Sequence, residues 1–162
     1  MFGRLIAMIV GAAAAVAASQ GPGFTLQYMQ NLAGRVDELR PIVEEFESRI
    51  ADYGYTRQAA MAECKTASGL LDALCGTYVS VVERFEMLLA HQTELNAAND
   101  YMRPVVLARS FKKDIAESVY KVYKPAVPAT PVGFAYGAAG FLAGWGVLSI
   151  FFGILGGLFG RR

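Results

Sequence analysis

The sequence predicts an all-α membrane protein in which two terminal transmembrane helices bracket an extramembrane antiparallel helical bundle or coiled-coil hairpin. Three observations predict this fold. The chain ends in a long uncharged apolar stretch, it begins with a shorter one, and its middle repeats apolar residues in steps of three and four. Apolar residues make up 54% of the chain and the net charge is only +1, which is unusually apolar for a soluble protein of 162 residues.

The C-terminal stretch carries no charged residue between Lys124 and Arg161. A bilayer core about 30 Å thick needs roughly 20 apolar residues in a helix, so residues 132–160 are expected to span it. Glycines recur there at four-residue spacing, which clears one helix face for the close approach of another helix. The packing glycines predicted in this span are Gly133, Gly137, Gly140, Gly144, Gly153 and Gly157.

The N-terminal apolar run, Leu5–Ala18, is short, and two interpretations compete for it. Arg4 followed by a short apolar region resembles a cleavable signal peptide. We expect instead an uncleaved anchor over residues 1–20. Ala7, Gly11 and Ala15 place a small residue at every fourth position, and we expect this face to pack against the glycines of the C-terminal span.

Positive charges near the two spans bear on localisation, because cytoplasmic flanks favour Lys and Arg. Arg4, Arg161 and Arg162 predict that both termini are cytoplasmic and that the middle domain is periplasmic, in the inner membrane of a bacterium. Lys121 and Lys124, just before the second span, favour the opposite orientation. The expected partners are the lipid bilayer and other membrane-protein subunits or copies of this chain. No basic stripe suggests nucleic acid.

Residues 24–124 are expected to form the helical extramembrane domain. Pro41 lies inside the first apolar seam and predicts a bend or a helix boundary near Arg40, and Gly21–Gly23 either interrupt the first helix or mark its exit from the membrane. A third amphipathic helix is expected after Pro104, and its inner face is expected to contain Val105, Ala108, Phe111, Ile115, Val119 and Val122. The first two seams contain Leu32, Val36, Leu39, Val43 and Phe46, then Leu74, Tyr78, Phe85 and Leu88, at heptad spacing.

These amphipathic stretches need partners for their apolar faces. An antiparallel bundle within one chain satisfies them, and zipping between copies is the alternative. Residues 125–131 carry prolines at intervals of three, which suits a polyproline-II linker before the second span.

The only two cysteines, Cys64 and Cys75, admit two readings: a disulfide or two buried thiols. In one straight helix they would be about 16 Å apart, beyond the reach of a disulfide. A bridge therefore requires a bend, which Gly69 offers, and an oxidising compartment.

Few residues suggest chemistry. His91 is the only imidazole and is expected to be a partly exposed helix residue, and the cluster of Glu44, Glu45 and Glu47 is expected to be a solvated helix face. No nucleophile motif, phosphate-binding loop or metal-ligand spacing is present. We therefore expect no catalytic residue, no metal and no cofactor.

Three segments resemble a known family. They are residues 23–39 (GFTLQYMQNLAGRVDEL), the turn Gly54-Tyr55-Thr56-Arg57, and the Gly-Phe-Leu-Ala-Gly-Trp segment at Gly140–Trp145. They are similar to the proteobacterial membrane proteins grouped as domain-of-unknown-function family 2937. The resemblance implies a layout of two terminal spans and a helical middle, and it brings no activity.

Together these observations predict a non-enzymatic inner-membrane accessory or scaffold subunit. It would pack through its glycine-rich helices in a homo-oligomer or a larger membrane complex. The alternative is a small oligomeric channel or transport component, for which the second span offers only Tyr136 and Ser149 as polar side chains.

Overall fold

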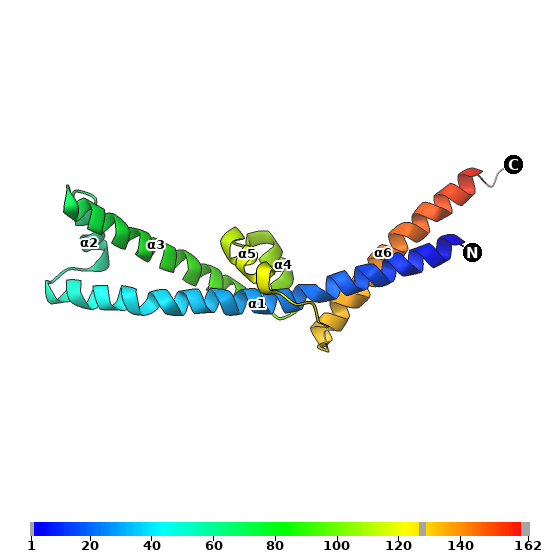
Figure 1. Ribbon diagram of the computed structural model, residues 1–162, viewed down its shortest axis with the longest axis horizontal. Coiled ribbons are helices and arrows are strands. Elements are labelled where there is room, and N and C mark those ends of the chain that lie inside the picture. The colour runs from blue at the N-terminus through cyan, green and yellow to red at the C-terminus, as the bar shows by residue number, and fades with distance from the viewer. Residues whose placement is uncertain (1, 127–128, 160–162) are drawn as a thin grey trace. The chain divides into compact units, whose positions relative to one another are not determined.

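The computed structural model of the chain describes residues 2–126 and 129–159, with only the backbone at Phe2 and at residues 156–159. These residues form six helices and no strand, which confirms the all-helical prediction (Figure 1). The chain divides into two compact units, one made of residues 1–28 and 98–162 and the other of residues 29–97. The proposed linker residues Val127 and Pro128 lie outside the described residues.

Helix α1 (Phe2–Asp52) is the longest element and contributes to both units. It passes through Gly21–Gly23 and through Pro41 without interruption, so neither of the helix boundaries that the sequence suggested at these points is present. A proline removes only one backbone hydrogen bond from a helix. Near Pro22 the Thr25 hydroxyl donates to the carbonyl of Gly21 at 2.8 Å, and Pro41 lies on the exposed face, away from the packed side chains.

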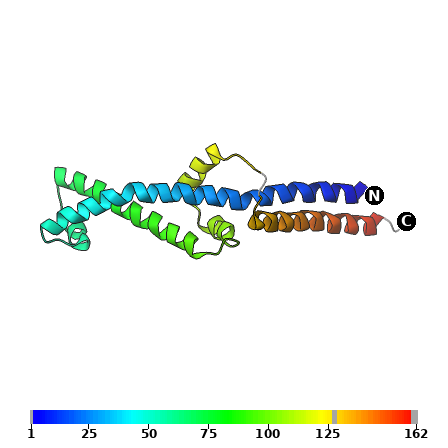
Figure 2. The same cartoon turned by 90° about the horizontal axis from the view of Figure 1, so that it is seen from below.

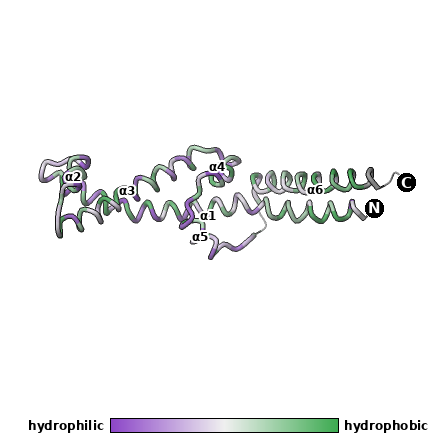
Figure 3. Tube along the Cα trace, turned by 90° about the horizontal axis from the view of Figure 1, so that it is seen from above, coloured by the Kyte–Doolittle hydropathy of each residue, from purple (hydrophilic) through white to green (hydrophobic). Residues whose placement is uncertain are grey.

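In the first unit, helix α6 (Pro131–Phe159) runs antiparallel to the first turns of α1 (Figures 1 and 2). Gly3 faces Phe152 near one end of the pair, and Gly21 faces Tyr136 near the other. Both helices are long and apolar enough to cross a membrane. Their hydrophobic character is visible along α6 and the neighbouring start of α1 in Figure 3.

The third amphipathic stretch forms two helices in this unit, α4 (Arg103–Ser110) and α5 (Lys113–Val122), where the sequence predicted one. The backbone is extended at Phe111 and Lys112, so the Lys112 N–H leaves the helical ladder and donates to the Tyr28 hydroxyl at 2.8 Å. This break turns Phe111 outward, and Val122 is also exposed, which corrects their expected place on the inner face. Leu107, Ile115 and Val119 are buried.

The second unit contains the rest of α1, helix α2 (Arg57–Cys64) and helix α3 (Leu70–Ala97). Gly54 (φ 78°) follows the end of α1, and Gly69 (φ 65°) precedes α3. Both have the left-handed conformation that glycine adopts without steric cost. Thr56 caps α2, because its hydroxyl accepts a hydrogen bond from the Ala59 N–H at 3.2 Å.

Within this unit α1 and α3 pack antiparallel. Phe46 of α1 stacks on Tyr78 of α3, and the Arg40 guanidinium lies 5.6 Å from the ring centre of Phe85. Most of the predicted seam residues in this unit therefore pack against one another within the chain. The fully buried or nearly buried residues of this core are Leu32, Val36, Val43, Val82, Phe85, Leu88 and Leu95, with Leu39 and Phe46 half-buried.

Two expectations for α3 need correction. Leu74 is 61% exposed, although its spacing placed it in the seam. The disulfide turns the face of Cys75 toward α2, and Leu74 lies about 100° around the helix from that face. His91 is only 4% exposed and belongs to the buried face of α3, whereas it was expected to be partly exposed.

Candidate functional site

The closest approach between α1 and α6 is made by two of the predicted packing glycines. A Cβ atom added at Gly140 would lie 2.6 Å from the carbonyl oxygen of Ala14 and 2.6 Å from the Cβ of Ala18. At Gly144 it would lie 2.8 Å from the Cβ of Ala14. Real Cβ atoms essentially never approach other atoms this closely. The α6 backbone therefore sits directly on α1, as small residues permit.

The predicted small residues Gly11 and Ala15 of α1 also contact α6, whereas the closest contacts are made by Ala14 and Ala18, which the predicted spacing of Ala7, Gly11 and Ala15 did not include. Ala7 and Gly11 are buried, and a Cβ added at Gly11 would lie 3.0 Å from the Cβ of Trp145. The carbonyl of Ala15 lies 3.6 Å from where a Cβ would stand at Gly137, an ordinary contact distance. Gly11 therefore lies against the side chains of Phe141 and Trp145, and Ala15 lies against Gly137.

The other glycines of α6 have different surroundings. Gly133 is buried. Gly153 has no atom within 4 Å of an added Cβ, and the same holds for Gly146. Gly157 belongs to α6 but lies beyond the residues whose surroundings the structure describes. The structure thus brings Gly137, Gly140 and Gly144 onto α1 and leaves Gly153 outside that contact.

A polar cluster at one end of the helix pair was not predicted from the sequence. The Gln20 side-chain oxygen accepts hydrogen bonds from the Tyr123 hydroxyl at 3.1 Å and from the Ala126 N–H at 3.2 Å. The Gln20 amide nitrogen donates to the carbonyl of Ala126 at 3.2 Å. Burial raises the pKa of Tyr123, so its hydroxyl keeps the proton that it donates. The only sequence signal for this cluster was the amide side chain of Gln20, which comes just after the apolar run of α1.

These bonds attach the chain after α5 to α1. The ring of Phe24 also meets the ring of Tyr123 edge-on, with centroids 5.6 Å apart. On the other side of the pair, the Tyr136 hydroxyl of α6 donates to the carbonyl of Tyr101 at 2.7 Å. The segments before α4 and after α5 are therefore each fixed to one of the two apolar helices.

In the second unit the structure joins Cys64 and Cys75 by a disulfide, with their Cα atoms 5.2 Å apart. The turn at Gly69 provides the bend that the spacing required. A cavity of about 280 Å³ lies beside the bridge, lined mainly by apolar atoms. At its wall the Tyr55 hydroxyl donates to Glu63 at 2.9 Å, and this hydrogen bond raises the pKa of Tyr55.

Arg57 is a second residue whose role the sequence did not indicate. Its guanidinium bridges Glu47 of α1 and Glu86 of α3, with 2.7 Å between Nη1 and the Glu86 oxygen. The side chains of Arg57 and Glu47 are 29% and 35% exposed, so these two charges are partly shielded from water, whereas Glu86 is exposed. Glu47, expected to be solvated with its neighbours, is therefore part of an ion-pair network that joins three helices.

Residues suited to chemistry are not brought together. Nδ1 of His91 lies 3.5 Å from Glu94 on the same helix, and the imidazole is buried. Over the described ranges, no three His, Cys, Asp or Glu side chains are grouped so as to hold a metal ion.

Comparison with known proteins identifies the family. The family model for proteins of unknown function, DUF2937, matches residues 2–161, which is essentially the whole chain. The chain belongs to this family. No curated protein and no solved structure matches it. For this DUF2937 protein the geometry of the helix pair is therefore the main guide to function.

Proposed function

We propose that this DUF2937 protein is a non-enzymatic accessory or scaffold subunit of the bacterial inner membrane, which holds a helical domain on a tightly packed pair of transmembrane helices. The observation that carries the proposal is the glycine contact at Gly140 and Gly144. It joins two apolar helices whose outer surfaces expose many large hydrophobic side chains. These include Leu5, Met8, Ile9, Val16, Phe134, Leu142, Val147, Ile150, Phe151 and Ile154.

Lipid provides the natural cover for that surface. Soluble proteins rarely expose contiguous apolar patches larger than a few hundred Å², whereas lipid tails accept such side chains without cost. The polar groups of the pair make local hydrogen bonds, as hydrocarbon requires. The Ser19 hydroxyl donates to the carbonyl of Val16 at 2.8 Å, and the Thr25 hydroxyl donates to Gly21.

The orientation with both termini cytoplasmic draws support from the disulfide in the second unit. Disulfides persist in oxidising compartments and are rare in the cytosol. A bond between Cys64 and Cys75 therefore favours a periplasmic location for this unit. The arginines at the two tips favour the same orientation.

The placement of the candidate groups supports a role without catalysis. His91, the only imidazole of the chain, is buried on the packed face of α3 and cannot meet a substrate there. Ser19, Gln20 and Tyr136 make hydrogen bonds near the ends of the two apolar helices, which leaves Ser149 as the only hydroxyl farther along α6 and gives little support to a channel lumen.

The outer face of α6 is the surface proposed for assembly. Gly146 and Gly153 are seven residues apart, so they share one helix face, and both are open to close approach. A helix of a second copy or of another membrane subunit could pack there without disturbing the contact with α1.

The test is a pull-down of the full chain in mild detergent, followed by mass determination. We expect a defined assembly larger than one chain. Replacing Gly146 and Gly153 by Leu should break it, whereas replacing both by Ala, which keeps the face small, should preserve it. A wild-type chain that purifies as a monomer without any partner would contradict the proposal, as would an assembly indifferent to the Leu variant.

A further inference from the structure

The charges of the chain are unevenly divided between its two units. Residues 29–97 carry six Lys/Arg and eleven Asp/Glu, for a net charge of −5. Residues 98–126, which contain α4 and α5 and which we call the collar, carry six Lys/Arg and three Asp/Glu, for a net charge of +3. The middle of the sequence is near neutral only because the negative charge of residues 29–97, the acidic unit, and the positive charge of the collar largely cancel.

Several cations of the collar form no ion pair among the residues that the structure describes. Asp100 pairs with Arg103 at 2.6 Å, Glu117 pairs with Lys113 at 3.6 Å, and Asp114 lies in the first turn of α5. Within the described part of the chain no ion pair involves the four remaining cations, which are Arg109, Lys112, Lys121 and Lys124. Of these, Arg109, Lys121 and Lys124 are exposed.

The collar is fixed to the apolar helix pair close to where the two spans end. Gln20 holds Tyr123 and Ala126, and Tyr136 holds Tyr101, through the hydrogen bonds described above. A bilayer core of about 30 Å requires roughly 20 residues of α1, so a span that begins near Leu5 ends near Phe24, the residue that touches Tyr123. With the span placed in this way, Lys121 and Lys124, which are near Tyr123 in the sequence, would lie at the depth of the lipid headgroups.

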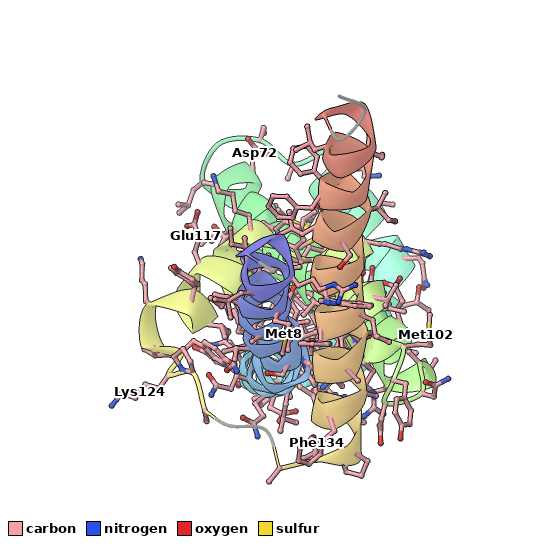
Figure 4. All side chains as sticks on the ribbon, turned by 90° about the vertical axis from the view of Figure 1, so that its right-hand side faces the viewer. Met8, Asp72, Met102, Glu117, Lys124 and Phe134 are labelled. Carbon is pink, nitrogen blue, oxygen red and sulfur yellow. A yellow bond between two sulfur atoms is a disulfide. The ribbon has the colours of Figure 1, made fainter. Side chains whose placement is uncertain are left out.

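The collar also exposes side chains suited to that depth. Tyr120 is 76% exposed and Val122 is 72% exposed, and both lie in the last turn of α5 beside Lys121. Tyrosine is enriched at membrane–water interfaces because its ring is apolar and its hydroxyl is polar. Seen from the right-hand side of Figure 1, Lys124 and Met102 lie on opposite sides of the two apolar helices (Figure 4).

We infer that the collar is a binding surface for the phosphate-bearing headgroups of anionic phospholipids, in the leaflet where both spans end. Arg109, Lys112, Lys121 and Lys124 would contact the phosphates, and Tyr120 and Val122 would enter the interface between headgroups and acyl chains. This inference rests on the proposed membrane anchoring. It gives the collar a specific function: it selects anionic lipid around the helix pair and sets the depth of the domain.

The test uses the purified full chain in mild detergent, supplied with phosphatidylcholine and phosphatidylglycerol at a molar ratio of 4:1. Native mass spectrometry then counts the retained lipids of each kind. We expect enrichment of phosphatidylglycerol that weakens with salt, as electrostatic contacts do. In the double variant Lys121→Gln with Lys124→Gln, the ratio of retained phosphatidylglycerol to phosphatidylcholine should fall by about fivefold for each lysine removed. The control, Arg49→Gln with Lys65→Gln, makes the same charge change in the acidic unit and should keep the preference.

Three outcomes would overturn the inference in distinguishable ways. Equal retention of the two lipids by the wild-type chain removes the collar function but leaves the anchoring intact. A wild-type chain that stays soluble without detergent and retains no lipid removes the proposed function as well. A salt-sensitive dimer that the collar variant abolishes, without any lipid preference, assigns the collar to the acidic unit of a second copy instead.

Discussion

Replacing Gly140 by Ala tests the contact between α1 and α6 with a single added methyl group. The new Cβ would lie 2.6 Å from the backbone oxygen of Ala14, whereas ordinary contacts begin at 3.4 Å. Since Ala14 contributes backbone atoms, the helices must separate by about 0.8 Å. A gap of this size forfeits roughly a quarter to a half of each dispersion contact along the interface. Overpacking of this kind costs about 1–3 kcal/mol.

The matched control is Gly146→Ala on the same helix, where an added Cβ meets no atom within 4 Å. Both variants share the gain in helix propensity, which is up to about 1 kcal/mol. The difference between them therefore isolates the contact, and we expect Gly140→Ala to be less stable than Gly146→Ala by about 1–3 kcal/mol.

The assay follows energy transfer between fluorophores attached at the two termini, because Gly3 and Phe152 lie together near the terminal end of the pair. Titration with sodium dodecyl sulfate in mixed micelles separates the helices and gives a midpoint for each variant. The reasoning fails if the two variants have the same midpoint, or if Gly140→Ala is the more stable of the two.

Three further predictions concern the second unit. Arg57→Ala should lower the free energy of unfolding by about 1–2 kcal/mol, because it leaves the partly shielded carboxylate of Glu47 unpaired and also breaks the pair with the exposed Glu86. Arg49→Ala, which breaks an exposed pair, should lower it by less than about 0.5 kcal/mol. Urea titrations measure both. Reducing the disulfide between Cys64 and Cys75, which are 11 residues apart, should lower the free energy of unfolding by about 3 kcal/mol in the same titration. An unchanged urea midpoint would contradict this. Tyr78→Phe should stabilise the unit by about 1 kcal/mol, because the buried Tyr78 hydroxyl finds no partner among the residues described. Burial raises the pKa of Tyr78 above its ordinary value of 10.0, so the wild-type unit should lose stability above about pH 10, as the unfolded chain ionises first, and the phenylalanine variant should lose less.

The sequence predicts the helices of this chain well because their apolar residues recur with a clear period. Leu32, Val36 and Val43 occur at heptad spacing and are buried, and Phe85 and Leu88 face them from α3. The glycine spacing of α6 likewise indicates the contact at Gly140 and Gly144, whereas the small-residue spacing of α1 did not single out Ala14 and Ala18, which those glycines meet.

The differences arise at prolines that the helix tolerates and at a contact that only the tertiary structure provides. Pro22 and Pro41 suggest breaks, yet α1 continues through both. In the opposite sense, the periodicity after Pro104 runs on through Phe111, where the helix actually breaks so that Lys112 can bond to Tyr28. The residues around Phe111 give no sign of this bond, because Tyr28 is 84 residues away in the sequence.

Leu74 and Gln20 illustrate two other limits of sequence reasoning. A heptad pattern continues whether or not a partner helix covers it, so it cannot show that Leu74 would be exposed. The role of Gln20 depends on a chain segment more than one hundred residues away, which the sequence gives no means to pair with it.

The most direct test of the account is a cross-link between α1 and α6 of one chain. A Cβ at Gly137 would lie 3.6 Å from the Cβ of Ser19, which suits a disulfide. The variant Ser19→Cys with Gly137→Cys should therefore oxidise to one bond within each chain, identified by peptide mass mapping, while Ser19→Cys with Gly146→Cys should not. A bond that forms only between chains, or equally in both variants, would contradict the glycine-packed pair.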